Sequence, residues 1–110
     1  MIVHVVLFRP RPGMTDVAQA ALTAALATAL REIPAVRRAR VGRRVTIGRP
    51  YETLMRTDYS HAALLEFDDV AGLRAYLEHP AHQELAHRFF ESFEEALLYD
   101  YEVEERAGGG

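Results

Sequence analysis

The sequence contains no cysteine, lysine, tryptophan or asparagine. Without cysteine the chain can form no disulfide, no thiolate nucleophile and no thiolate-ligated metal site. The net charge of −3 and the pI near 5.9 argue against a general nucleic-acid binder. No apolar run approaches the roughly 20 residues of a membrane-spanning helix. Met1 leads straight into a strand-like run, so we expect a cytoplasmic protein with neither a membrane nor a nucleic acid as partner.

The length and composition indicate one folded domain. The chain has 110 residues, of which 49% are hydrophobic and 26% are charged. A domain of this size buries roughly 60–70% of the surface that its unfolded chain exposes, so it needs no disulfide or structural metal to fold. We assign residues 1–104 to the domain and residues 105–110, which end in three glycines, to a flexible tail.

Hydrophobic periodicity, capping residues and Pro and Gly breaks divide the domain into seven elements. β-Branched and aromatic runs favour strands, whereas apolar residues spaced by three and four favour helices. The predicted strands cover residues 2–8, 36–47, 60–67 and 98–103. The predicted helices run from Thr15 or Asp16 to Ile33, from Asp68 or Asp69 to His79, and from Pro80 to about Leu97.

This order of elements predicts an α+β fold of the ferredoxin-like βαββαβ kind, with a four-stranded antiparallel sheet. Right-handed crossovers place all helices on one face of that sheet and make the first and third strands central neighbours. The first strand nevertheless carries apolar residues on both faces, with Val3 and Val5 opposing Ile2 and Val6. A large bare apolar face is unusual for a monomer, so we expect a second copy to cover it as a homodimer.

The segment around Pro80 is the most informative stretch for function. Proline suits the first turn of a helix, so Pro80 predicts a helix start with His79 as its cap. Counting from His82 in steps of three and four reaches the apolar stripe of that helix, at Leu85, Ala86, Phe89, Phe93 and Ala96. His82 therefore faces inward, where an unsatisfied imidazole would cost on the order of 1–3 kcal/mol.

Other polar side chains are expected near His82. Strand alternation places His4 and His61 on single faces of their strands, and both converge with His82 if those faces point toward the helices. Tyr76 lies on the preceding short helix, where its hydroxyl can reach the same cavity. Asp100, on the strand expected beside the first, can orient one of these imidazoles.

Five segments resemble the stress-responsive α/β-barrel (Dabb) family in their order and spacing. They are His4–Phe8, Ile33–Val36, Tyr59–Ala62, Tyr76–His82 and Asp100–Tyr101. The resemblance implies a ferredoxin-like protomer that forms a dimeric α/β barrel, with a pocket between sheet and helices in each copy. The family includes a plant polyketide cyclase, olivetolic acid cyclase, and stress-associated proteins with no agreed reaction.

The resemblance also implies site residues. The reacting tyrosine and histidine of the cyclase correspond to Tyr76 and His82, and two histidines of its pocket correspond to His4 and His61. Where the cyclase has aromatic residues on its first helix, this chain has Leu22, Thr23 and Leu26, so the substrate does not carry over. We assign the substrate-binding wall to His4, His61, His79, Leu22, Leu26 and Phe89.

These residues support two functional hypotheses. The first is a cyclase-like or isomerase-like enzyme without a cofactor, in which His82 exchanges a proton and Tyr76 stabilises an enolate of a carbonyl compound. The second is a non-catalytic, stress-responsive binding or structural protein whose histidines are satisfied core residues. Haem or cofactor-free monooxygenase chemistry is disfavoured, because the tryptophan and asparagine that such sites commonly use are missing.

A metal site is chemically allowed but disfavoured. Imidazole and carboxylate groups suit zinc or iron, and His4, His61, His82 and Asp100 could supply them. No pair among them has the short helical spacing of a metal motif, so we expect no bound metal.

The second predicted strand is rich in arginine, at positions 37, 38, 40, 43 and 44. This pattern is consistent with an anion-binding patch or with an edge strand that charge protects against unwanted pairing. We favour the edge strand because the whole chain is acidic. His87 falls at the polar edge of the last helix, and we expect it on the solvated surface.

Overall fold

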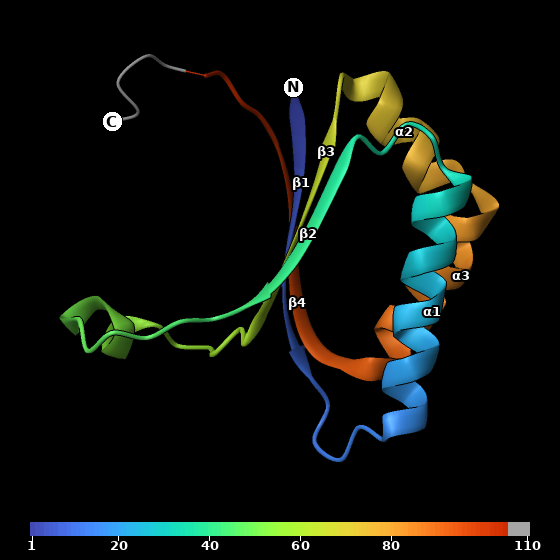
Figure 1. Ribbon diagram of the computed structural model, residues 1–110. Helices are drawn as coiled ribbons and strands as arrows, with labels where there is room; N and C mark the ends of the chain where they lie inside the picture. The colour runs from blue at the N-terminus through green and yellow to red at the C-terminus, as the bar shows by residue number, and fades with distance from the viewer. Residues whose placement is uncertain (106–110) are drawn as a thin grey trace.

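The computed structural model describes residues 1–105 and contains a four-stranded antiparallel sheet with the order β2-β3-β1-β4. The elements are β1 (Ile2–Pro10), α1 (Asp16–Glu32), β2 (Arg38–Arg43), η1 (Pro50–Leu54), β3 (His61–Phe67), α2 (Val70–Glu78), α3 (Pro80–Ser92) and β4 (Phe93–Glu102). Figure 1 shows α1, α2 and α3 on one face of this sheet. The α+β, ferredoxin-like prediction is therefore confirmed. The expected tail lies, from residue 106 on, outside the described residues.

Side-chain caps set the helix starts. The Thr15 hydroxyl accepts a hydrogen bond from the backbone N–H of Ala18 at the start of α1. Asp69 caps α2, and the His79 imidazole accepts from the Ala81 N–H at the start of α3. Each cap satisfies an N–H group that has no partner within its helix. The predicted cap at His79, with Pro80 in the first turn, is confirmed.

The boundary between α3 and β4 differs from the prediction. The helix was expected to reach Leu97 and the strand to cover 98–103, but α3 ends at Ser92 and β4 begins at Phe93. β1 extends to Pro10, and its distal residues pair with residues 93–97. Backbone groups in a buried strand require hydrogen-bond partners, and this requirement outweighs the helix propensity of the Glu-Glu-Ala-Leu run. The prediction failed because the competing contact is distant in sequence.

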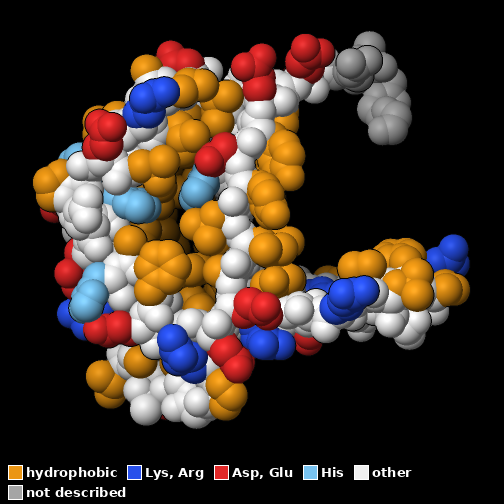
Figure 2. All heavy atoms as spheres, turned by 180° about the vertical axis from the view of Figure 1, so that it is seen from behind, with side chains coloured by type: hydrophobic (Ala, Val, Ile, Leu, Met, Phe, Trp, Pro, Cys, Tyr) orange, Lys and Arg blue, Asp and Glu red, His pale blue; other side chains and the backbone are white. Residues whose placement is uncertain are grey.

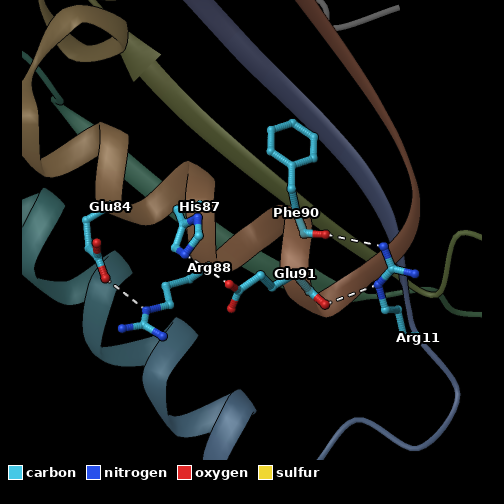
Figure 3. Close-up of polar contacts among 6 residues, drawn as sticks. All are labelled: Arg11, Glu84, His87, Arg88, Phe90 and Glu91. Atoms are coloured by element: carbon cyan, nitrogen blue, oxygen red, sulfur yellow. Dashed lines mark hydrogen bonds and ion pairs between the residues drawn. The ribbon is translucent and has the colours of Figure 1, made fainter.

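Arg11 holds the end of α3 in place, as Figure 3 shows. Its guanidinium donates to the backbone carbonyls of Glu91, at 3.1 Å, and Phe90, at 3.4 Å. Its backbone N–H donates to the Ser92 carbonyl at 3.0 Å. These bonds satisfy carbonyl groups that a helix end leaves unpaired. On the outer face of α3, His87 pairs with Glu91 at 2.9 Å, which confirms its surface position.

β2 lies at a sheet edge, as predicted, but it is shorter than the expected 36–47. After the Arg44 N–H donates to the Ser60 carbonyl at 2.9 Å, β3 offers no further partner and the chain leaves the sheet. Arg38 and Arg40 reach the Glu66 carboxylate at 3.8 and 3.6 Å. Charge along this edge is therefore partly neutralised within the chain.

The sheet has two different faces. Toward the helices, alternate residues of β1 are buried, and Phe67 and Leu65 of β3 join the core with Ile33. On the opposite face, Val5 is half-buried and its partner Tyr99 is 52% exposed. Figure 2 shows hydrophobic side chains along this uncovered face. The predicted apolar character of both faces is confirmed.

Within residues 1–105, no helix has the length and apolar character that crossing a membrane requires.

Candidate functional site

A cavity of about 270 Å³ lies between the helices and the helix-facing side of the sheet. In Figure 2 the surface is hollowed between these layers, and histidine side chains lie beside the hollow. Seven of the predicted site residues line the cavity: His4, Leu22, Leu26, His61, Tyr76, His82 and Phe89. The remaining wall is mainly aliphatic and aromatic, which suits an apolar ligand with a few polar groups.

His4 and Asp100 form the tightest polar contact of the site. They are direct cross-strand partners on β1 and β4, and the His4 Nδ1 lies 2.6 Å from an Asp100 carboxylate oxygen. His4 is buried, whereas Asp100 is partly open to solvent. A carboxylate on one ring nitrogen sets the tautomer and orientation of the imidazole. Asp100 thus orients His4, and it does not line the cavity itself.

Tyr76 lies between two imidazoles. Its ring centroid is 6.1 Å from that of His4 and 4.7 Å from that of His82, with the second pair edge to face. Burial raises the pKa of Tyr76 to about 12, so the phenol is protonated at neutral pH. None of residues 1–105 forms a hydrogen bond with this hydroxyl, which therefore remains able to donate to a ligand.

His82 is in the first turn of α3 and is half-buried. Burial lowers the pKa of His82 below 6.5, and the nearby His4 lowers it further, while a hydrogen bond to the Leu77 backbone opposes both. A backbone group that raises the pKa of an imidazole must be a carbonyl that accepts its N–H. With its pKa lowered, His82 is largely unprotonated at neutral pH, so one ring nitrogen can act as a base.

His61 lies at the other end of the cavity. Its ring stacks on Phe8 at 5.5 Å, and its Nδ1 is 2.8 Å from the Ser60 hydroxyl. Along β3, His61 pairs with Phe8 and Leu65 pairs with His4, so four residues, or about 13 Å of strand, separate the two positions. The structure therefore brings His4, Tyr76 and His82 together and keeps His61 apart from them.

Two predicted positions have different surroundings from the other site residues. His79 serves as the cap of α3 and is not among the cavity-lining residues. The four side chains considered as metal ligands do not surround a common point, since Asp100 binds His4 and His61 is distant. In the part of the chain that the structure describes, no three His, Asp or Glu side chains group as metal ligands would.

Sequence analysis named Thr23 only as a position in the stretch that matches the cyclase's aromatic residues, and it missed Gln19. Gln19 and Thr23 of α1 line the cavity beside Leu22 and Leu26. Their spacing of three and four residues from one another and from the leucines places all four on one helical face. That spacing was an available signal, but a search for apolar stripes passes over polar residues.

Residues 2–103 match the Stress responsive A/B Barrel Domain (Dabb) family. This match covers every strand and helix described above. Among curated proteins, none matches the chain significantly.

Solved structures share the fold at low sequence identity. A protein from Arabidopsis thaliana is 23% identical with a TM-score of 0.79, covering 97% of this chain and 99% of that one. A hydroxynitrile lyase from Passiflora edulis is 21% identical with a TM-score of 0.78, covering 96% and 90%. A dimeric ferredoxin-like protein of unknown function from Jannaschia sp. CCS1 is 26% identical with a TM-score of 0.70, covering 93% and 98%. By its match over residues 2–103, the chain belongs to the stress-responsive α/β-barrel (Dabb) family.

Proposed function

We propose that the protein binds a small, partly apolar carbonyl compound and catalyses its cyclisation or isomerisation by acid–base chemistry. One observation carries the proposal: in the wall of an apolar cavity, the protonated phenol of Tyr76 lies beside the neutral imidazole of His82. The centroids of the two rings are 4.7 Å apart. At neutral pH the phenol keeps its proton and can donate a hydrogen bond, while the imidazole is unprotonated and can accept a proton, and these two states suit proton transfer next to a carbonyl.

The reaction follows from these two groups. His82 removes a proton from the carbon next to the carbonyl, and the Tyr76 hydroxyl donates a hydrogen bond to the oxygen on which charge develops. In a cyclisation, the enolate carbon attacks a second carbonyl of the same molecule, and the resulting alkoxide takes the proton back from His82. In an isomerisation, His82 returns the proton to a different atom. His4, oriented by Asp100, supports the position of the Tyr76 ring.

Hydroxynitriles are a second class of test compound. A hydroxynitrile lyase has the same fold, and loss of cyanide from a hydroxynitrile also needs a base on one oxygen and yields a carbonyl. The same His82 and Tyr76 would serve this reaction, so the assay distinguishes between substrates and not between sites.

The test measures proton exchange and ligand binding together. Wild type in D₂O is incubated with 1,3-diketones, β-keto thioesters and aromatic hydroxynitriles, and NMR follows deuterium uptake or product formation. We expect turnover in the wild type, a loss in Tyr76→Phe of about 10²-fold or more, and a ligand-dependent rise in Tm. If no compound reacts or shifts Tm, and both Tyr76→Phe and His82→Ala lower Tm, the non-catalytic, stress-responsive alternative holds instead.

We further propose that two copies pack through the uncovered sheet face as a homodimer. This face presents Tyr99 and Tyr101, each 52% exposed, and the structurally similar Jannaschia protein is dimeric. An exposed apolar surface of this kind is typical of protein interfaces.

Light scattering is expected to give twice the chain mass of 12.4 kDa. Tyr99→Glu should shift the protein toward monomer because it places a charge in the apolar interface. The matched control is Val17→Glu, at a position on α1 that is 80% exposed, and it should leave the mass unchanged. A wild-type monomer at every concentration would contradict the dimer.

A further inference from the structure

A second hollow adjoins the cavity at its His61 end. It has a volume of about 530 Å³ and is more open and more polar. Both hollows are lined by His61 of β3, Pro10 at the end of β1, Met14 of the following loop and Gln19 of α1. Because they share these walls, the outer hollow lies directly beside the His61 end of the cavity whose wall contains Tyr76 and His82.

Arg43 borders this outer hollow. Ala39, Val41 and Arg43 alternate along β2 on the helix-facing side, and Arg43 pairs directly with His61. Val41 accordingly lines the apolar cavity, and Arg43 follows it at the rim. Strand geometry therefore aims this guanidinium at the opening, not at the uncovered face of the sheet.

Arg43 differs from the other arginines around β2 in its partners. The other four lie within 4 Å of a carboxylate, in the pairs Arg37–Asp68, Arg38–Glu66, Arg40–Glu66 and Arg44–Asp58. No carboxylate within residues 1–105 lies that close to Arg43. A guanidinium without an anion, at the mouth of an apolar cavity, can bind an anionic group of a ligand.

We infer that the substrate is a carboxylic acid, with its carboxylate on Arg43, its apolar body in the cavity and its reactive carbonyl at Tyr76 and His82. Only the position of the reactive carbonyl in this inference rests on the proposed function. One free guanidinium matches a carboxylate in a two-pronged arrangement. Asp58, which also lines the hollow, disfavours a multiply charged phosphate. Arg43 pairs with His61, whose strand position is four residues, or about 13 Å of strand, from that of His4, so a ligand that spans both ends of the cavity must be elongated, as a medium-chain oxo acid is.

The test compares two ligands of equal length, decanoate and decanol, by isothermal titration calorimetry. We expect the wild type to bind decanoate about tenfold more tightly than decanol, an advantage that added salt reduces. Arg43→Gln should remove this advantage and leave decanol binding unchanged. The matched control is Arg74→Gln, at an exposed position on α2 that lines neither hollow, and it should keep the preference. Light scattering checks that both variants keep the wild-type mass.

Equal affinity for the two ligands, no binding of decanoate, or an unchanged preference in Arg43→Gln would each overturn the inference. These outcomes are separable from failure of the proposed function. A carboxylate preference without any turnover leaves the anion site valid and removes the reaction. Turnover that is equal for an oxo acid and its methyl ester leaves the reaction valid and removes the anion site.

Discussion

Replacing His82 by glutamine is expected to lower kcat/KM by about 10²- to 10⁴-fold on any carbonyl substrate that the exchange assay identifies. Glutamine keeps the approximate size and polarity of imidazole, but it cannot take up a proton near neutral pH. His82 lies in the first turn of α3 and lines the cavity, so the loss measures the absence of a proton acceptor at that position. Steady-state kinetics of both proteins under identical conditions measure the effect.

The pH profile supplies an independent signature of the same group. Because the pKa of His82 is lowered from 6.5, the imidazole stays neutral into mildly acidic solution. Wild-type kcat/KM should therefore fall only below pH 6.5, as the base becomes protonated. Tyr76, with a pKa of about 12, keeps its proton at every pH suitable for assay. We expect no loss of activity from Tyr76 on the alkaline side below about pH 11.

His87→Gln is the matched control, since this histidine lies on the outer face of α3 and pairs with Glu91. Its kinetics should equal those of the wild type. A His82→Gln variant with wild-type kcat/KM, or an acidic limb that persists in that variant, would remove His82 from the reaction.

Phe67→Ala is expected to lower the free energy of unfolding by about 3–5 kcal/mol. The Phe67 side chain is 0% exposed, and its ring lies 5.4 Å from that of Tyr76 in the main core. Truncation removes buried apolar surface and leaves a cavity that the surrounding strands and helices cannot fill. Since domains are typically stable by only 5–15 kcal/mol, the change should be large in urea denaturation.

Phe90→Ala provides the comparison, because that phenylalanine is 61% exposed. This substitution should change the free energy of unfolding by no more than about 0.5 kcal/mol. Similar losses for the two variants would show that the core assignment is wrong.

Elements with strong local signals agreed with the structure. Thr15, Asp69 and His79 with Pro80 mark helix starts through contacts with residues two or three positions away. The order of strands and helices then restricts the topology to few alternatives. The segment from Phe93 to Leu97 was wrongly predicted as helix. Its strand partner is β1, more than 80 residues earlier, and local sequence signals do not reveal such a distant pairing.

Site residues divide in the same way. Alternation and helical spacing placed His4 and His82 on inward faces, and both residues line the cavity. Periodicity assigns a face, but it does not assign a position along the strand. The antiparallel register of β1 and β3 pairs His61 with Phe8, and only this pairing separates His61 from His4.

The amino-acid pattern by itself determined the fold class, the inward direction of His82 and the helix cap at His79, because each depends on neighbours within a few residues. The tertiary structure decided that Asp100 pairs with His4, that Tyr76 packs against His82 and that Arg43 has no acidic partner among residues 1–105. Partners of this kind depend on strand register and helix packing, which bring together groups as far apart as His4 and Asp100, 96 residues along the chain.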